Sequence, residues 1–185
     1  YGMQLGYMNS STTYGKKLFK VTNNAIYNIG NSGELYGIYS YGGDSSYIAH
    51  NTVNINLGTG TSTSAQYGIY VYNTSNSYQV RNNNVTFTAG NNGTKYGIYC
   101  SNTLFSTNAA MQNNNVFMNS SRTGTQNRAY YGAARANLAA LQAAYPALEI
   151  NGLEVNPMYA NQATGDLTPT NGAIFMKGEN LTAIL

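Results

Sequence analysis

The chain has 185 residues, of which 8% are charged and 42% hydrophobic, and its net charge is +3. This length suffices for one domain with a sizeable core, and the hydrophobic content argues against a disordered chain. The single cysteine, Cys100, excludes an internal disulfide, and no apolar run approaches the roughly 20 residues needed to span a bilayer.

The basic residues are spread along the sequence, and only Lys16, Lys17 and Lys20 form a cluster. Binding to nucleic acid relies on several basic groups that follow one surface. We therefore expect no nucleic-acid partner, and we interpret the three lysines as a solvated edge.

Two motifs recur along the first two thirds of the chain. Tyr-Gly-Ile-Tyr begins at Tyr36, Tyr67 and Tyr96, and weaker copies begin at Tyr1 and Tyr130. A second motif, with asparagines between two apolar positions, covers residues 21–26, 48–53, 80–85 and 111–116. Both motifs share a period of about 30 residues, which is typical of repeat proteins.

Each repeat contains three short β-prone runs separated by Gly, Asn, Ser and Thr. A degenerate first rung covers residues 1–35, and later rungs cover 36–66, 67–95 and 96–129. We therefore expect an all-β fold in residues 1–129: a single chain coiled into a parallel β-helix of about four to five rungs. Neighbouring rungs would lie one strand spacing, about 4.8 Å, apart.

Strict alternation along a strand predicts which side chains face inward. In the Tyr-Gly-Ile-Tyr strand we expect the isoleucines Ile38, Ile69 and Ile98 to face inward. By the same alternation, the first tyrosine of each motif (Tyr36, Tyr67 and Tyr96) and the residue after each motif (Ser40, Val71 and Cys100) would also face inward. The glycines at 37, 68 and 97 would face outward with Tyr39, Tyr70 and Tyr99. In the second motif, Val21, Ile48, Val80 and Met111 would form one buried column, and Ile26, Val53, Val85 and Val116 another.

The bend inside the second motif contains an asparagine in every rung. Asparagine tolerates a left-handed backbone, and its amide can bond to the equivalent amide one rung away. We predict an asparagine ladder formed by Asn24, Asn51, Asn83 and Asn114.

After Ala129 the two repeat motifs give way to a different kind of sequence. Residues 138–145 are the one helix candidate, with Asn137 as N-cap and Pro146 ending it. We expect residues 130–185 to form a C-terminal rung or capping region. We also expect the chain to be a fragment of a longer protein, with its first rung covered by further rungs or another domain.

Short strands, an asparagine ladder and variable loops resemble the right-handed parallel β-helix of the pectin-lyase-like superfamily. Residues 130–180 resemble the end of bacterial choice-of-anchor Q proteins, although Asn156 replaces an Asp of that pattern. Asn171-Gly-Ala-Ile-Phe175 stands where Ser-Pro-Ala-Ile-Asp is expected. The resemblance implies a secreted or cell-surface bacterial protein.

Polysaccharide lyases of this fold use clustered acids to hold calcium and a basic residue as the base, and the hydrolases use paired carboxylates. The rungs contain Glu34 and Asp44 in different loops, and Glu149, Glu154, Asp166 and Glu179 are scattered through the tail. We therefore expect no catalytic residues, no metal site and no cofactor. His50, at the polar corner, and Cys100, in an inward column, are expected to be structural.

The outward tyrosines Tyr39, Tyr70 and Tyr99, flanked by Tyr41 and Tyr72, are the candidate binding residues. Exposed aromatic rings can stack on sugar rings or on a partner. Alternatively, stacked tyrosines stabilise adjacent rungs. The neighbouring glycines would leave one side of each ring open.

The sequence favours a non-catalytic structural or adhesive segment. Its partners would be neighbouring rungs or domains of the same protein, cell-surface glycans, or the secretion and anchoring machinery. The alternative is a carbohydrate-binding or polysaccharide-degrading β-helix whose catalytic rungs lie outside this chain.

Overall fold

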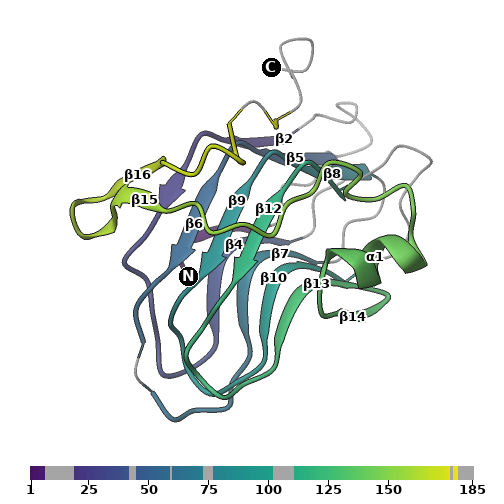
Figure 1. Cartoon of the computed structure of the whole chain (residues 1–185). Helices are drawn as coiled ribbons and strands as arrows, with labels where there is room; N and C mark the ends of the chain where they lie inside the picture. The colour runs from purple at the N-terminus through teal and green to yellow at the C-terminus, as the bar shows by residue number, and fades with distance from the viewer. Residues whose placement is uncertain are drawn as a thin grey trace.

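The chain folds into a parallel β-solenoid (Figure 1). The structure is a computed structural model that describes residues 1–6, 19–41, 45–58, 60–72, 77–101, 111–175 and 177–178. Three sheets line the solenoid, and the chain visits them in the same order in every rung. The predicted all-β parallel fold with one short helix is therefore confirmed.

Sheet A contains the Tyr-Gly-Ile-Tyr strands. Its members are β1 (Met3–Gly6), β4 (Leu35–Tyr41), β7 (Gln66–Tyr72), β10 (Lys95–Cys100), β13 (Gln126–Tyr131) and β14 (Ala133–Arg135). The first five strands are parallel, and β14 returns antiparallel to β13.

The second motif divides between sheets B and C. Sheet B contains β2 (Phe19–Thr22), β5 (Ser45–Ala49), β8 (Ser77–Arg81) and β11 (Met111–Gln112). Sheet C contains β3 (Ala25–Ile26), β6 (Thr52–Ile55), β9 (Asn84–Phe87) and β12 (Asn115–Met118). The asparagine bend is the corner between these two sheets.

The regular part of the solenoid amounts to about three turns, formed by β4 to β6, β7 to β9 and β10 to β12. The shorter strands β1 to β3 precede it and β13 follows it, so the expected count of four to five rungs was slightly high for the regular part. Equivalent motif positions are in register: Tyr36 pairs with Tyr67, and Tyr67 with Tyr96.

The core is made of the predicted apolar columns. Ile38, Ile69 and Ile98 line sheet A from inside with at most 1% of their surface exposed. Both columns predicted from the second motif are buried opposite them, as are Ser40, Val71 and Cys100. The repeat period therefore identified the residues that fill the solenoid.

The expected inward position of Tyr36, Tyr67 and Tyr96, and the outward position of the glycines, were wrong. Leu35, Gly37 and Ile38 are buried, whereas Tyr36 and Tyr39 are both partly exposed. Sheets A and C approach so closely here that a Cβ on Gly37 would lie 2.4 Å from Val53 Cγ1. Only a glycine can therefore face inward at this position. Because Gly37 and Ile38 both face inward, strict alternation is interrupted between them, and the preceding Tyr36 faces outward.

The C-terminal region closes the last rung. Helix α1 (Leu138–Ala144) starts at the predicted N-cap, where Asn137 Oδ1 accepts the Ala140 N–H at 2.8 Å. The following segment pairs with the ends of β11 and β12: Glu149 N–H donates to the Met111 carbonyl at 2.8 Å, and Val116 N–H to Leu153 at 2.9 Å.

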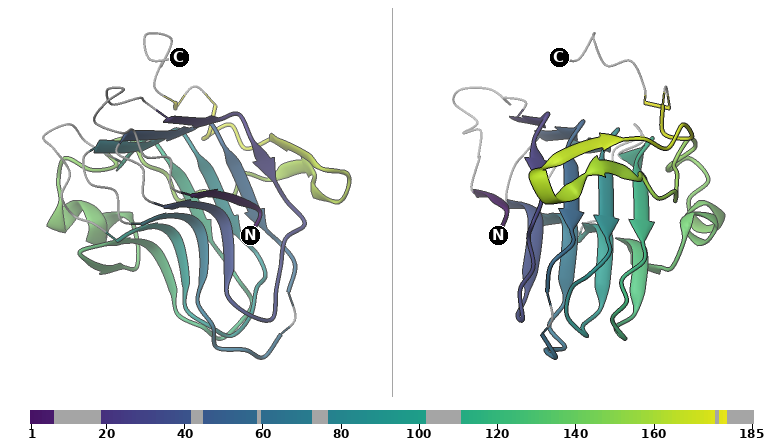
Figure 2. Two further views of the ribbon diagram at one scale, coloured as in Figure 1. Left: turned by 180° about the vertical axis from the view of Figure 1, so that it is seen from behind. Right: turned by 60° about the vertical axis from the view of Figure 1, so that its left-hand side comes forward.

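A hairpin then crosses the outer face of sheet C (Figure 2). It consists of β15 (Tyr159–Asn161), a 3-10 turn (Gln162–Thr164) and β16 (Asp166–Pro169). Asn115 Nδ2 donates to the Val155 carbonyl at 2.9 Å, and Asn54 Nδ2 to Gln162 Oε1 at 3.2 Å. The tail thus covers sheet C, while the outer face of sheet A carries the tyrosines.

Among the described residues, no helix has the length and apolar character required to cross a membrane.

Candidate functional site

The outer side of sheet A is a continuous array of tyrosines, which we call the tyrosine face. Its first column is Tyr1, Tyr36, Tyr67 and Tyr96; its second is Tyr39, Tyr70, Tyr99 and Tyr130; its third is Tyr41 and Tyr72. The structure thus brings the five tyrosines predicted as binding residues onto one surface. The first column, expected inside the core, joins them.

Rings within a column stack along the solenoid axis. In the first column, the ring centres of Tyr36 and Tyr67 are 4.9 Å apart with a 14° angle between planes. In the second, Tyr70 and Tyr99 are 4.8 Å apart at 9°, and Tyr99 and Tyr130 are 4.3 Å apart at 12°. The spacing follows the rung repeat, because equivalent residues are in register.

The first and second columns meet edge to face, whereas the rings of the second and third columns are nearly parallel, with Tyr39 and Tyr41 6.3 Å apart at 13°. Tyr67 and Tyr70 lie 4.7 Å apart at 76°, and the diagonal pair Tyr67 and Tyr99 lies 5.2 Å apart at 85°. Stacking along columns combined with edge contacts between them is a herringbone arrangement, in which positive ring edges meet negative ring faces. The array therefore stabilises successive rungs, whatever else it does.

This packing restricts what a partner can touch. The faces of the inner rings are occupied by other tyrosines, and the glycines beside them point into the core. Only the border of the array is widely exposed: Tyr1 is 69% and Tyr72 39% accessible. The expectation that glycines leave one side of each ring open was therefore wrong, and the central rings offer edges and hydroxyl groups instead.

The tyrosine face is electrically neutral over most of its area. Burial raises the pKa of the phenols of Tyr36, Tyr39 and Tyr70, and raises that of Tyr67 to about 12. Glu34, beside Tyr36, adds to the upward pKa shift of that ring. The hydroxyl groups therefore stay protonated near neutral pH and can donate as well as accept hydrogen bonds.

The predicted asparagine ladder is present at the corner between sheets B and C. The Nδ2 of Asn24, Asn51 and Asn83 donates to the Oδ1 of the next ladder asparagine at 2.9, 3.0 and 3.0 Å. The same Oδ1 atoms accept the backbone N–H groups of the preceding ladder residues. The left-handed backbone belongs to the residues just before, Asn23, His50, Asn82 and Asn113.

The ladder ends on a buried carboxylate that the sequence did not reveal as important. Glu149 is fully buried, and its carboxylate accepts both donors of Asn114. Arg128, 1% exposed, lies with Nη2 3.4 Å from Glu149 Oε2 and donates to the carbonyls of Asn114 and Leu153. Burial raises the pKa of Glu149, and the Arg128 charge and the Asn114 donors oppose that shift.

Spacing could have identified Glu149. The ladder residues are 27, 32 and 31 positions apart, and Glu149 follows Asn114 by 35. Glu154, the other partner of Arg128 at 3.8 Å, accepts the Leu138 N–H at the start of α1. Both acidic side chains therefore attach the C-terminal region to the last rung of the solenoid.

A second set of polar side chains lies inside sheet A, at the start of its strands. Lys95 is fully buried, and its Nζ donates to the Asn91 and Gly93 carbonyls at 2.7 and 3.0 Å. Its register neighbours Gln66 and Gln126 likewise bond to backbone groups of the adjoining loops. Burial lowers the pKa of Lys95.

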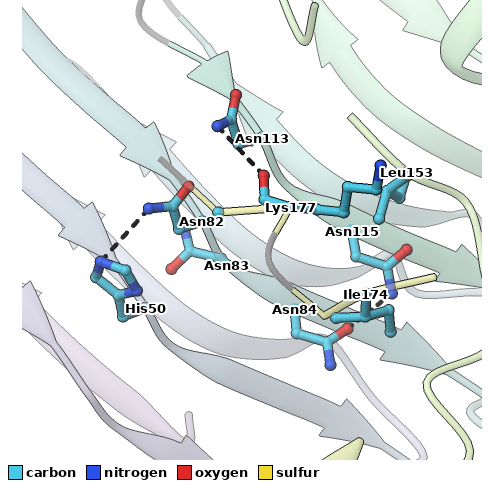
Figure 3. A pocket seen from close by; sticks show the side chains of 10 residues that line it. His50, Asn82, Asn83, Asn84, Asn113, Asn115, Leu153, Ile174 and Lys177 are labelled. Carbon is cyan, nitrogen blue, oxygen red and sulfur yellow. Dashed lines mark hydrogen bonds between the residues drawn. The ribbon is translucent and has the colours of Figure 1, made fainter. Parts of the chain in front are cut away.

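A cavity of about 140 Å³ lies outside the ladder, between the corner and Ile174, Lys177 and Gly178 (Figure 3). His50 Nε2 is 3.4 Å from Asn82 Nδ2, and Asn113 Nδ2 donates to the Lys177 carbonyl at 3.5 Å. His50 thus occupies the corner column as expected from the sequence, with an amide as its neighbour.

Other candidate groups are dispersed. Burial raises the pKa of the Cys100 thiol to about 12, consistent with its predicted place in the core. Glu34 directly precedes β4, and Asp166 is the first residue of β16 in the hairpin. Asp44 and Glu179 lie outside the described residues. Within the described ranges, no three Asp, Glu, His or Cys side chains gather as metal ligands would.

Comparisons with protein-family models, with curated proteins and with solved structures found no match for this chain.

Proposed function

We propose that this chain is a non-catalytic structural and adhesive segment of a secreted or cell-surface protein, which presents the tyrosine face to neutral glycans. One observation supports this above all: ten tyrosines form a continuous outer surface over five parallel strands. Hydroxyl groups repeat along this surface with apolar ring edges between them, which matches the alternating hydroxyl and C–H groups of a sugar chain.

The hydrogen bonds and the ion pair made by the buried charged side chains support a structural role. Arg128 and Glu149 bond to each other and to the last ladder asparagine, and Lys95 bonds to loop carbonyls. These side chains stabilise the loops and the last rung of the solenoid, and they do not converge on a cleft. The parallel solenoid and its ladder also support the proposed kinship with the pectin-lyase-like and choice-of-anchor proteins of bacterial surfaces.

The neutral surface favours neutral over acidic glycans. Glu34 is the charged group beside the first column, and it would repel a carboxylated or sulfated chain. A polysaccharide-degrading protein remains the alternative function, because such a protein would also require a surface that binds sugars.

The test is affinity electrophoresis of the whole chain in gels that contain neutral polysaccharides (a β-glucan, a mannan, a xylan) or acidic ones (pectate, alginate). Tyr72→Ser, at the exposed border, and Tyr70→Ser, at the centre, are compared with Tyr27→Ser, whose exposed ring lies beside Gly165 of the hairpin and away from the tyrosine face. Circular dichroism checks that each variant is folded.

We expect retardation in at least one neutral gel, a loss of about tenfold in affinity for the two tyrosine-face variants, and no change for Tyr27→Ser. Shortened or unsaturated sugar products in solution would instead establish the enzyme alternative. The adhesive proposal would be overturned if the chain migrated freely in every gel, or if Tyr27→Ser had the same effect as Tyr70→Ser.

A further inference from the structure

The second column of the tyrosine face brings phenol rings unusually close. Tyr99 and Tyr130 are register partners whose ring centres are 4.3 Å apart with a 12° angle between planes, and Tyr70 and Tyr99 follow at 4.8 Å and 9°. Because such rings are nearly parallel and project from equivalent positions, their equivalent Cε atoms are separated by about the same distance as the ring centres.

The Cε atoms flank the phenol oxygen and carry much of the unpaired electron density when a tyrosine is oxidised to its radical. Two such radicals held side by side join through these carbons. From this geometry we propose that the tyrosine face is a site of oxidative modification, where dityrosine bonds join successive rungs, first between Tyr99 and Tyr130. This goes beyond the proposed function and does not depend on glycan binding.

The reaction requires a one-electron oxidant, for which we take a peroxidase with hydrogen peroxide. Each phenol loses one electron and its O–H proton, and the two radicals form one Cε–Cε bond. The hydrogens on these two carbons then move through water to the phenol oxygens, so both rings end as phenols. The peroxide takes up the two electrons and two protons and leaves as two molecules of water.

Position within the sheet determines which tyrosines can react in this way. Tyr99 and Tyr130 are partly exposed on the outer side of sheet A, so an oxidant can reach their edges. Tyr131 is next to Tyr130 in the chain but points inward, with 5% of its surface accessible. Pairs between the first and second columns, such as Tyr96 and Tyr99 at 82°, meet edge to face, so their Cε atoms are not matched for coupling; the nearly parallel pair Tyr70 and Tyr72, between the second and third columns, is farther apart, at 5.9 Å.

The bond would have a structural consequence. Tyr99 and Tyr130 belong to consecutive strands of sheet A, β10 and β13, and a covalent link between them closes the whole rung that separates them. Cross-links of this kind restrict the unfolded chain and therefore stabilise the folded one.

The experiment treats the whole chain with a peroxidase and limiting hydrogen peroxide at low protein concentration, and follows dityrosine fluorescence. Trypsin then cuts after Lys95, Arg122, Arg128 and Arg135, and mass spectrometry identifies linked peptides. The expected product joins peptide 96–122 to peptide 129–135 of the same chain, with the loss of two hydrogens.

Two matched variants test the assignment. Tyr130→Phe removes the reacting phenol and should abolish this link, whereas Tyr131→Phe, in the same peptide, should leave its yield unchanged. Oxidation in urea should reduce the specific link at least fivefold, because unfolding separates the rungs. The proposal would be overturned by links that are mainly between molecules, by a link that survives Tyr130→Phe, or by an unchanged yield in urea.

Discussion

Glu149 takes the place beside Asn114 that a ladder asparagine takes in each earlier rung. Its Oε2 accepts the Asn114 backbone N–H at 3.0 Å, and its Oε1 accepts Asn114 Nδ2 at 2.6 Å. A carboxylate offers acceptors and no donors, so it satisfies both groups without requiring another rung beyond it. Arg128 balances its charge in the interior.

Replacing Glu149 with Gln should therefore destabilise the fold. The new amide turns one acceptor into a donor that faces Asn114, and Arg128 loses its buried counter-charge. We expect unfolding in urea to show a loss of about 3 kcal/mol. The control is Glu154→Gln, whose side chain is 37% exposed, for which the loss should stay below about 1 kcal/mol. Equal losses for the two variants would contradict a capping role for Glu149.

The middle of the ladder should be equally sensitive to the loss of its hydrogen bonds. Asn83 donates to Asn114 Oδ1 and to the Ile48 carbonyl, and accepts from the backbone and side chain of Asn51. Asn83→Leu keeps a side chain of the same length, branched at Cγ, and leaves these buried partners unpaired. We expect a loss of on the order of 1 to 3 kcal/mol in urea unfolding.

Asn56→Ala is the control for the ladder, because Asn56 is partly exposed and its Nδ2 donates to Asn28 Oδ1 near the surface. It should change stability by less than about 0.5 kcal/mol. If Asn83→Leu were as stable as this control, the ladder would contribute nothing to the fold.

The close approach of sheets A and C can be tested at Gly68. A Cβ there would lie 2.3 Å from Val85 Cγ1 and 2.5 Å from the Gly97 carbonyl oxygen, so Gly68→Ala should cost about 1 to 3 kcal/mol. Adding Val85→Ala should recover only part of this loss, since the backbone contact remains. Gly172→Ala, with no atom within 4 Å of its Cβ, should be close to neutral. A thermal melt of the three variants would contradict the packing if Gly68→Ala unfolded at the wild-type temperature.

Much of the fold could be predicted because the period is visible in the sequence. Once Ile38, Ile69 and Ile98 are aligned, register follows, and so do the buried columns and the positions of Asn24 to Asn114. The helix was recognisable because Asn137 and Pro146 mark its ends. These features depend on residues within one repeat, or on residues at equivalent positions of adjacent repeats.

What was missed depends on contacts between different sheets. Alternation predicts the facing of a straight strand, but Gly37 faces inward because Val53, on the opposite sheet, leaves no room for a side chain. The column of Tyr36, Tyr67 and Tyr96 was consequently expected inside the core, so its edge-to-face packing with the outward tyrosines was not predicted. Glu149 was missed because its role appears only when the tail folds back onto Asn114.

The herringbone should make the protein sensitive to alkaline pH. Burial raises the pKa of Tyr67 to about 12, above the value of about 10 for a tyrosine in an unfolded chain. Folding therefore favours the neutral phenol, so this stability is fully present below pH 10 and is lost as the pH rises from about 10 to about 12. Urea midpoints measured by circular dichroism should fall over that interval, and tyrosinate absorbance should appear together with unfolding.

Tyr67→Phe separates this effect from a general sensitivity to base. Phenylalanine keeps the stacked ring and cannot ionise, so the variant should lose less stability than the wild type between pH 9 and pH 12. The two proteins should be similar near pH 8, where the phenol is neutral in both the folded and the unfolded chain. An identical decline in both would show that the buried phenols of the tyrosine face do not control alkaline unfolding.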